Sequence, residues 1–217
     1  MDSPKRRVTT KNITFELSNV HLHGPAFFDY LSLRKQFFVD ELHWQIPHDA
    51  EVEMDQYDNP MARYSLVLDD HGRVVAGARA MSTTAKWGDH TYMLKDAMTG
   101  KLGTIPSNLL SEIVDSPKVW ECTRLVMAPE IKSMRGRLQC LDLIVGGLID
   151  MATAEGAERM LSLSNLWVLR ALKRLGYGAE FLGQPYENDD DGHKYAVIGI
   201  PARHKHVANP VLEMSAA

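Results

Sequence analysis

The sequence predicts an α/β protein, of the α+β kind, in which one mixed sheet has helices on both faces. The 217 residues are enough for one substantial core, and they contain no repeat or linker that would divide it. Strand-like and helical segments alternate along the chain, with one hairpin among them. Such an order of connections favours a sheet with both parallel and antiparallel pairs. We expect the folded domain to cover residues 12–205, between loose tails at 1–11 and 206–217.

The first part of this domain contains a strand, a helix and a long irregular segment. Apolar and polar residues alternate over 13–20, which predicts a strand. After a proline, apolar residues at helical spacing predict a helix over 26–41. Residues 44–61 are polar and show no period. Because long irregular connections are usually functional or disordered, we interpret this one as a functional loop.

The middle of the chain is mostly strand-like. Two runs at 62–69 and 73–81 flank the turn sequence Asp-His-Gly, which predicts a hairpin. Short helices are expected at 93–98 and 107–113. Residues 119–127, VWECTRLVM, have the composition of a buried strand.

The last part contains two helices and two strands. Apolar residues from Leu138 to Ala152 form one stripe at helical spacing, which predicts a long helix, the clearest of the chain. A second helix is expected at 166–175, because an asparagine precedes it and a glycine follows it. Short apolar runs predict strands at 160–164 and 194–201, and the acidic run before the last strand predicts an exposed turn at 187–191.

Composition excludes several classes of protein. The 24 Lys and Arg against 28 Asp and Glu leave a mild negative charge, which argues against a nucleic-acid partner. No apolar run approaches the roughly 18 residues of a membrane span. The start, MDSPKRRVTT, has no apolar segment typical of a secretory signal. Two cysteines form no disulfide framework and the histidines form no metal motif, so we expect a cytoplasmic protein without a metal.

Several ionisable residues lie in stretches that otherwise have the composition of a core. They are Arg34, Asp55, Asp58, Arg79, Glu121 and Arg124. Burying a charge is unfavourable unless it is paired and hydrogen-bonded. Two hypotheses follow: the charges balance one another as a structural ion-pair network, or they bind a zwitterionic ligand.

A second charged region precedes the apolar stripe of the helix predicted from Leu138 to Ala152. Gly136 lies between Arg135 and Arg137, and Lys132 is nearby. The free N–H groups of a helix N-terminus bind anions, and a glycine permits close approach of a ligand. This segment resembles the acyl-carrier binding loop of the GNAT acyltransferase superfamily, although Leu138 stands where that loop usually has a second glycine. The alternative is a solvated basic turn.

The wider pattern resembles the acyl-homoserine-lactone synthase family of the LuxI type, over residues 31–185. The segments that carry the resemblance are LRKQFFVDELHW, D-x-Y-D at 55–58, GARAM, YML and ECTR. The residues at the characteristic positions of the family are Arg34, Phe38, Trp44, Asp55, Asp58, Arg79, Glu121 and Arg124. The resemblance implies a GNAT-like fold. A further aromatic position of the family is Met98 here, which alters one pocket wall.

The resemblance also implies a reaction. An acyl-carrier thioester, supplied by acyl carrier protein or acyl-CoA, would acylate the amine of S-adenosylmethionine. Lactonisation would then release methylthioadenosine and a quorum-sensing signal. Both reactants are substrates, so no cofactor is expected. The rival hypotheses are a related GNAT acyltransferase that uses another amine and a catalytically inactive ligand-binding module.

The chemistry of S-adenosylmethionine suggests a role for each position. The expected catalytic residues are Glu121, Asp55, Asp58 and Arg124. The expected S-adenosylmethionine-binding residues are Arg34, Phe38, Trp44 and Arg79. Guanidinium groups suit the substrate carboxylate, whereas carboxylates and aromatic faces suit the sulfonium and the amine.

Glu121 is our candidate for the general base, acting through water, and the alternative is that it only orients Arg124. Because these two residues are three apart, a regular strand would point them to opposite faces. If both line one pocket, the strand must be bulged between them, and the GNAT resemblance implies such a bulge. It would also separate this strand from its neighbour and open a slot for the thioester arm.

The acyl chain needs an apolar pocket. The candidates for its lining are Met98, Met127, Leu161, Leu163 and Trp167. Ordinary core packing explains these residues nearly as well.

Overall fold

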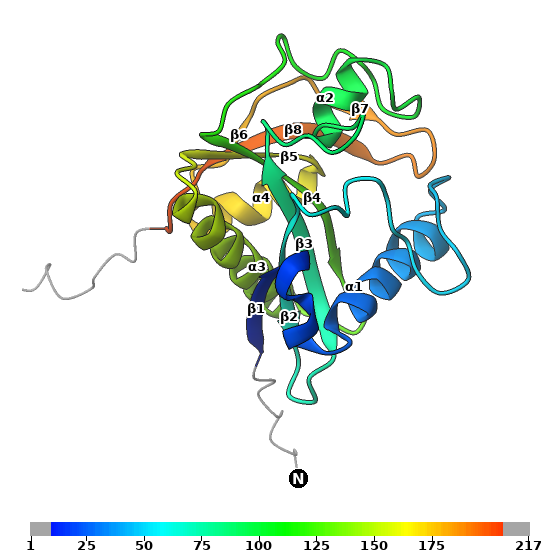
Figure 1. Cartoon of the computed structure of the whole chain (residues 1–217), viewed down its shortest axis with the longest axis vertical. Coiled ribbons are helices and arrows are strands. Elements are labelled where there is room, and N and C mark those ends of the chain that lie inside the picture. The colour runs from blue at the N-terminus through cyan, green and yellow to red at the C-terminus, as the bar shows by residue number, and fades with distance from the viewer. Residues whose placement is uncertain (1–9, 206–217) are drawn as a thin grey trace, which may run out of the picture.

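The computed structural model describes residues 10–205 and contains one sheet of eight strands (Figure 1). The strands are β1 Lys11–Glu16, β2 Arg63–Leu68, β3 Val74–Ser82, β4 Val119–Met127, β5 Arg159–Asn165, β6 Glu180–Phe181, β7 Tyr186–Glu187 and β8 Lys194–Pro201. Their order is β1-β2-β3-β4-β5-β8-β6, and β7 also pairs with β8. The pair β4–β5 is parallel, and the other pairs are antiparallel.

Helices cover both faces of this sheet, which confirms the predicted fold class. They are α1 Ala26–Arg34, α2 Met93–Met98, α3 Met134–Ala154 and α4 Leu166–Leu175. On β2, Ser65 faces α3 beside Gly147, whereas the next residue, Leu66, faces α1 beside Tyr30 and Gly77. Because neighbouring side chains on a strand point to opposite faces, α1 and α3 lie on opposite sides of the sheet (Figure 1). No helix in the described part of the chain has the length and apolar character that a membrane span requires.

Several predicted elements match the structure residue for residue. The helices predicted at 93–98 and 166–175 and the strands predicted at 119–127 and 194–201 have those bounds. Asn165 begins α4 by accepting hydrogen bonds from the backbone N–H groups of Trp167 and Val168 at 3.1 and 3.3 Å. Gly176 ends the helix in a left-handed conformation with φ of 89°.

Three predictions were wrong at particular residues. Lys11 belongs to β1, where it pairs with Leu68, so the strand begins inside the predicted tail; residues 1–9 and 206–217 lie outside the described range. The strand predicted over 13–20 stops at Glu16, because residues Leu17–His23 form a 3₁₀ helix, η1. Residues 107–113 form turns, because Leu109 is the only buried side chain among them and a short helix needs a packed face.

The helix predicted over 26–41 changes its winding part-way. After α1, residues Lys35–Glu41 form a π-helix, η2. Its hydrogen bonds span one residue more than those of an α-helix, as in the bond from Leu42 N to Phe37 O at 3.1 Å. Such π-helical turns occur often at functional sites, and this one supplies Phe38 to the cavity described below.

The predicted bulge is present in β4. The register with β3 shifts between Gly77 and Arg79, and Arg124 has a left-handed backbone with φ of 56°. Beyond Glu121, β4 no longer pairs with β5. The two strands therefore diverge where the thioester slot was expected.

Close packing between α3 and the sheet makes a stability prediction. A Cβ atom at Gly147 would meet Asn12 Oδ1 at 2.5 Å and Ser65 Oγ at 2.6 Å. Overpacking of this kind typically destabilises by about 1–3 kcal/mol, so Gly147→Ala should lower the free energy of unfolding in urea by that amount. The matched control is Gly146→Ala on the same helix, where the nearest atom is His204 Cε1 at 3.7 Å. That control should be neutral or stabilising by up to about 1 kcal/mol, and equal effects of the two variants would contradict the packing.

Candidate active site

Three arginines and three carboxylates form one buried cluster on the α1 side of the sheet. We call it the charged cluster; its members are Arg34, Glu53, Asp55, Asp58, Arg79 and Arg124. Three different strands or helices supply the arginines, and the loop at 44–61 supplies all the carboxylates. The cluster therefore joins the loop to the sheet.

Two arginines of the cluster are completely buried. Arg34 Nε lies 2.6 Å from Glu53 Oε2, and its Nη1 lies 2.8 Å from Asp58 Oδ1. Arg79 Nη1 lies 2.6 Å from Asp55 Oδ1 and 2.8 Å from Asp58 Oδ1. Both side chains are 0% exposed, so these pairs are shielded from solvent. The network holds Asp55 and Asp58 in place from beneath.

Arg124 is the third arginine, and the bulge aims it at the same carboxylates. Its Nη2 lies 3.1 Å from Glu53 Oε1 and 2.9 Å from Asp55 Oδ2. Tyr30 donates a hydrogen bond from its hydroxyl to the carbonyl oxygen of Arg124 at 2.8 Å, which fixes the left-handed backbone. Strained backbone of this kind often marks a functional site.

The charged cluster is electrically balanced. Burial alone would raise the pKa of Asp55, but Arg79 and Arg124 hold it well below its usual range. Burial also acts to raise the pKa of Asp58, and Arg79 and Arg34 keep it lowered. Asp55 and Asp58 are therefore ionised, and each carboxylate of the cluster faces an arginine. The structural ion-pair hypothesis is confirmed for the buried part of the set.

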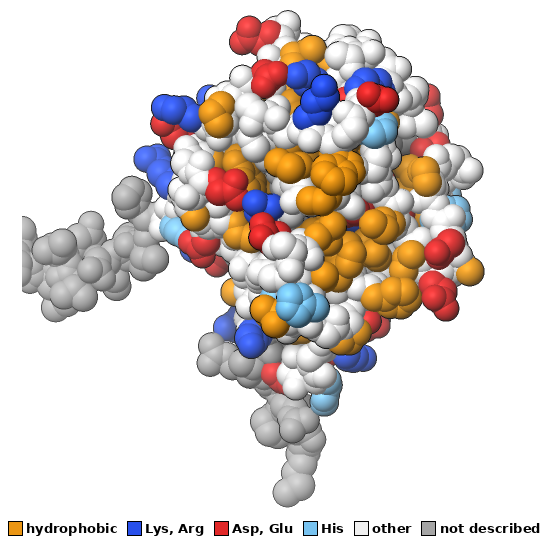
Figure 2. Space-filling model, in the orientation of Figure 1, with side chains coloured by type: hydrophobic (Ala, Val, Ile, Leu, Met, Phe, Trp, Pro, Cys, Tyr) orange, Lys and Arg blue, Asp and Glu red, His pale blue; other side chains and the backbone are white. Residues whose placement is uncertain are grey.

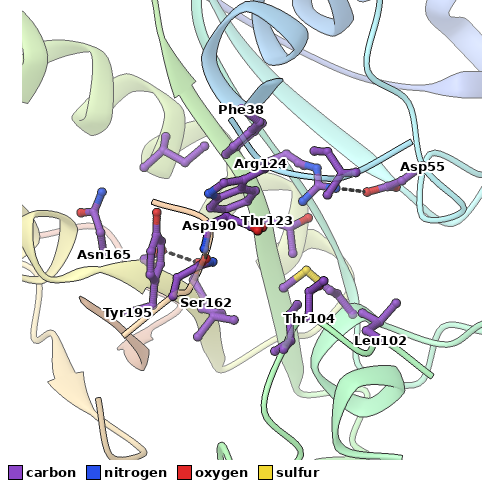
Figure 3. Close-up of a pocket in the computed structure, with 18 of the residues that line it drawn as sticks. Phe38, Asp55, Leu102, Thr104, Thr123, Arg124, Ser162, Asn165, Asp190 and Tyr195 are labelled. Carbon is purple, nitrogen blue, oxygen red and sulfur yellow. Dashed lines mark hydrogen bonds and ion pairs between the residues drawn. The ribbon is translucent and has the colours of Figure 1, made fainter. Parts of the chain in front are cut away.

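A cavity of about 300 Å³ lies above the charged cluster, between the diverging ends of β4 and β5. Asp55 and Arg124 are the cluster members that line it, and Figure 3 shows their side chains meeting there. Ser162, Asn165 and Tyr195 line the opposite wall. In the face shown in Figure 2, hydrophobic side chains gather around a hollow. The site thus combines a partly buried ion pair with a lining of both apolar and polar side chains.

The structure brings together part of the set singled out from the sequence. The predicted residues that line the cavity are Phe38, Trp44, Asp55, Arg124, Met127, Arg137, Leu163 and Trp167. Arg34, Asp58 and Arg79 lie beneath it, within the charged cluster. Their position is suited to holding the loop rather than to direct contact with a ligand.

Two predicted pocket residues lie elsewhere. Met98 is at the far end of α2, and Met93 at the other end of that helix lines the cavity instead. Leu161 precedes the point where the strands diverge, and it lines a separate apolar cavity of about 50 Å³ against α3 and α4. Five residues line both cavities; they are Thr123, Leu125, Ser162, Ser164 and Val168.

The basic segment was predicted as a loop, but α3 begins at Met134, so Arg135, Gly136 and Arg137 form the first turn of the helix and only part of the segment is at the site. Ser133 caps the helix by accepting a hydrogen bond from Gly136 N at 3.0 Å, so this N–H is already occupied. Lys132 and Arg135 are exposed, as the solvated-turn alternative requires. Arg137 turns toward the cavity, where its guanidinium lies 4.8 Å from the centre of the Trp167 ring.

Glu121 is buried but separate from the charged cluster. Its carboxylate accepts hydrogen bonds from the backbone N–H groups of Met93 and Leu94, both at 2.8 Å, at the start of α2. Burial raises the pKa of Glu121 to about 7, although these two N–H groups act in the opposite direction. The alternative that Glu121 orients Arg124 was wrong, because Glu53 and Asp55 hold that guanidinium.

Glu53, which was not predicted from the sequence, takes the place expected for Glu121 in the charge balance. Glu53 is 0% exposed and contacts both Arg34 and Arg124. Its spacing of two from Asp55 was the available indication, because alternate residues of an extended segment point the same way. Asp191, expected in an exposed turn, was also missed: it accepts a hydrogen bond from Trp44 Nε1 at 2.7 Å.

Comparison with known proteins shows the family of the chain. The model of the autoinducer synthase family matches residues 22–206. The chain belongs to the autoinducer synthase family. An acyl-homoserine-lactone synthase of Ralstonia nicotianae is 29% identical over 182 residues, covering 77% of this chain and 84% of that protein. Another, from Acinetobacter nosocomialis, is 27% identical over 165 residues and covers 74% and 84%.

Solved structures share the fold of this autoinducer synthase. BjaI, a CoA-dependent acyl-homoserine lactone synthase with SAM and isopentyl-CoA, has a TM-score of 0.70 at 20% identity, covering 90% of this chain and 84% of its own. TofI, in a ternary complex with an inhibitor and MTA, has a TM-score of 0.69 at 23% identity, covering 88% and 91%. A putative N-acetyltransferase from Lactobacillus plantarum matches at 0.52 and 15%, covering 90% and 99%. The predicted GNAT-like fold and acyltransferase class are confirmed.

The charged cluster makes a stability prediction for this synthase. Removing one partner of a buried ion pair typically destabilises by about 3–5 kcal/mol, because the other charge is left unpaired. Arg34→Ala should therefore lower the free energy of unfolding in urea by that amount. In either variant each carboxylate keeps another arginine while one negative charge of the cluster loses its counter-charge. Arg124→Ala is the matched comparison because its side chain is 11% exposed, whereas Arg34 is 0% exposed. It should lose less than half as much, and equal losses would contradict the division between buried and cavity-facing arginines.

The raised pKa of Glu121 makes a second prediction. Its pKa is about 7 in the folded protein against an ordinary value of 4.5, so the folded state binds this proton more tightly. The resulting stability is complete below about pH 4.5, declines as the pH rises toward 7 and is lost above it, by roughly 3 kcal/mol in total. In Glu121→Gln this decline should vanish. Urea unfolding of both proteins from pH 4.5 to 8 measures the difference, and parallel curves would exclude the raised pKa.

Proposed function

We propose that this autoinducer synthase makes an acyl-homoserine lactone from S-adenosylmethionine and an acyl thioester, and releases methylthioadenosine. The observation that carries the proposal is the cavity wall formed by Arg124 and Asp55. It presents one cation and one anion side by side, as a zwitterionic amino-acid group requires. The relatives named acyl-homoserine-lactone synthase, and the BjaI structure with SAM and isopentyl-CoA, support the same substrates.

Arg124 and Asp55 would bind the amino-acid end of S-adenosylmethionine. The carboxylate of the substrate would form an ion pair with the guanidinium of Arg124, and the substrate ammonium would lie beside Asp55. The rings of Phe38 and Trp44 line the same cavity and stack on each other with centroids 4.8 Å apart. Their faces suit the sulfonium. Arg34, Arg79 and Asp58 are proposed as positioning residues that hold this pair in place.

The acyl chain would enter the slot between β4 and β5. Met127, Leu163 and Trp167 line this part of the cavity. The smaller apolar cavity that Leu161 lines extends the same region toward α3. Because Arg137 is near Trp167, and Lys132 and Arg135 lie at the start of α3, an anionic donor suits this end of the slot. Acyl carrier protein and acyl-CoA both meet that description, and we propose Lys132 and Arg135 as contacts for either.

The reaction would proceed in two steps. The free amine of the substrate attacks the thioester carbonyl, the carbon–sulfur bond breaks, and the carrier leaves as its thiol. A carboxylate oxygen of the acylated amino acid then attacks the side-chain carbon that is bonded to the sulfonium sulfur. That carbon–sulfur bond breaks, and methylthioadenosine leaves with its electron pair. We propose Glu121 as the acceptor of the amine proton through water, since its pKa of about 7 suits a base at neutral pH. We also place the enzyme in the cytoplasm, where its two cysteines would stay reduced.

A direct assay tests this function. Incubation of the protein with S-adenosylmethionine and acyl-CoA or acyl carrier protein should release methylthioadenosine and an acyl-homoserine lactone in equal amounts, measured by liquid chromatography and mass spectrometry. Arg124→Ala should lower kcat/KM by about 100-fold or more, because a charged hydrogen-bonding partner of the substrate is lost. The matched control is Arg170→Ala, on the exposed surface of α4, which should leave the rate unchanged. Acylation of a different amine without methylthioadenosine would favour the related GNAT acyltransferase.

A further inference from the structure

Asp191 holds the side chain of Trp44 from the opposite end of the chain. Its Oδ2 accepts hydrogen bonds from Trp44 Nε1 and from the Tyr195 hydroxyl, both at 2.7 Å. Its Oδ1 accepts a third from the backbone N–H of His193 at 2.8 Å. Three donors on one carboxylate use both of its oxygens, so this side chain has a fixed orientation.

This contact joins two parts of the molecule that otherwise meet only through packing. Among the described residues, it is the only hydrogen bond or ion pair between the segment 35–61 and the segment 180–205. The first segment contains the π-helix η2 and the loop of the charged cluster. The second contains the strands β7 and β8 and the turn between them. Both segments line the cavity, so this hydrogen bond connects them on the aromatic side of the cavity.

The aromatic packing around Trp44 does not fix the rotation of the indole in its own plane, whereas the hydrogen bond to Asp191 does. The indole stacks on Phe38 at 4.8 Å and meets the Tyr195 ring edge-on at 5.8 Å. Stacked rings slide and turn in their plane at little cost, whereas an N–H directed at a carboxylate fixes the in-plane orientation. Phe38 in turn lies 5.3 Å from the guanidinium carbon of Arg124. Asp191 is thus connected through Trp44 and Phe38 to the cation proposed to bind substrate.

We propose that Asp191 is a positioning residue, which latches the Trp44 indole onto the cavity wall and thereby sets the affinity for S-adenosylmethionine. The first half of this statement rests on the contacts alone. The second rests on the proposed function, because it takes S-adenosylmethionine as the ligand beside Trp44 and Arg124. In the latched state the aromatic wall is formed before the substrate arrives, so binding does not have to order it.

The Asp191→Asn variant tests the latch. A single amide oxygen replaces two carboxylate oxygens for three donors, and the charge is lost. We expect the KM for S-adenosylmethionine to rise by about 10-fold while kcat changes less than about threefold and the thermal midpoint stays the same. The matched control is Asp189→Asn in the same turn, an exposed residue outside the latch, which should leave all three unchanged. An unchanged KM, or a fall in kcat alone, would overturn the role in substrate affinity.

A double-mutant cycle shows whether the effect passes through the indole N–H. Trp44→Phe keeps an aromatic ring beside Phe38 but removes the donor to Asp191. Once that donor is absent, Asp191→Asn should add little further loss of affinity, so the two effects should be clearly less than additive. Additive effects would show that Asp191 acts on the substrate by another route and would overturn the proposal.

Hydrogen exchange tests the latch independently of the proposed function. The backbone N–H of Trp44 donates to Phe38 O at 2.9 Å, so its exchange rate reports how firmly this segment is held. In the substrate-free protein, exchange at Trp44 should accelerate about 10-fold in Asp191→Asn and stay unchanged in Asp189→Asn. Unchanged exchange in both would overturn the latch. If wild-type protein makes no lactone while exchange behaves as expected, only the proposed function and its link to affinity fail.

Discussion

The buried ion pairs of Arg34 and Arg79 are the constraint on which the site depends. They tie a loop without regular secondary structure to the end of α1 and to β3, with distances of 2.6–2.8 Å and no exposure of either guanidinium. The loop has few backbone–backbone hydrogen bonds of its own. Side-chain hydrogen bonds such as those from Glu51 N and Val52 N to Asp49 Oδ1 form local turns, and the ion pairs fix where the loop lies on the sheet. Because those carboxylates are neutralised from below, Arg124 and Asp55 can face the cavity without the electrostatic cost of an isolated buried charge. The two hypotheses for the charged set are therefore compatible: the deep members balance one another, and the shallow pair faces a ligand.

One extra residue in β4 connects this charge arrangement to the shape of the cavity. The bulge turns Arg124 to the side of Asp55, and beyond Glu121 the same strand separates from β5. A regular strand would have pointed Arg124 into the face covered by α3 and kept the slot closed. A single bulge thus places Arg124 at the cavity and opens the slot beside it. The bulge requires a left-handed backbone at Arg124, which a hydrogen bond from Tyr30 stabilises.

The sequence was most informative where local patterns coincide with tertiary packing. The helix after Asn165 and the strand at 119–127 could be placed to the residue, because their caps and composition are unambiguous. The bulge could be predicted from the resemblance to the GNAT superfamily, together with the three-residue spacing of Glu121 and Arg124. The prediction of a helix at 107–113 was wrong for the converse reason. A pair of apolar residues does not show whether the rest of the protein offers a surface against which a helix can pack.

Long-range pairings were beyond prediction from one sequence. The spacing of Glu53 from Asp55 suggested a shared direction, but it did not identify Arg34 and Arg124 as the partners of Glu53. Asp191 lies in an acidic turn, and its contact with Trp44 spans 147 positions. Which of the arginines face the cavity likewise follows from three-dimensional packing, as the buried position of Arg79 shows.

The central claim is that Arg124 and Asp55 bind the amino-acid end of a zwitterion above a cluster that is already neutral. Calorimetric binding of S-adenosylmethionine and of methylthioadenosine to wild-type and Arg124→Ala protein tests it most directly, because the second ligand lacks the carboxylate and the amine. The account predicts that the variant binds S-adenosylmethionine at least about 10-fold more weakly and methylthioadenosine equally well. Equal weakening of both ligands, or of neither, would contradict it.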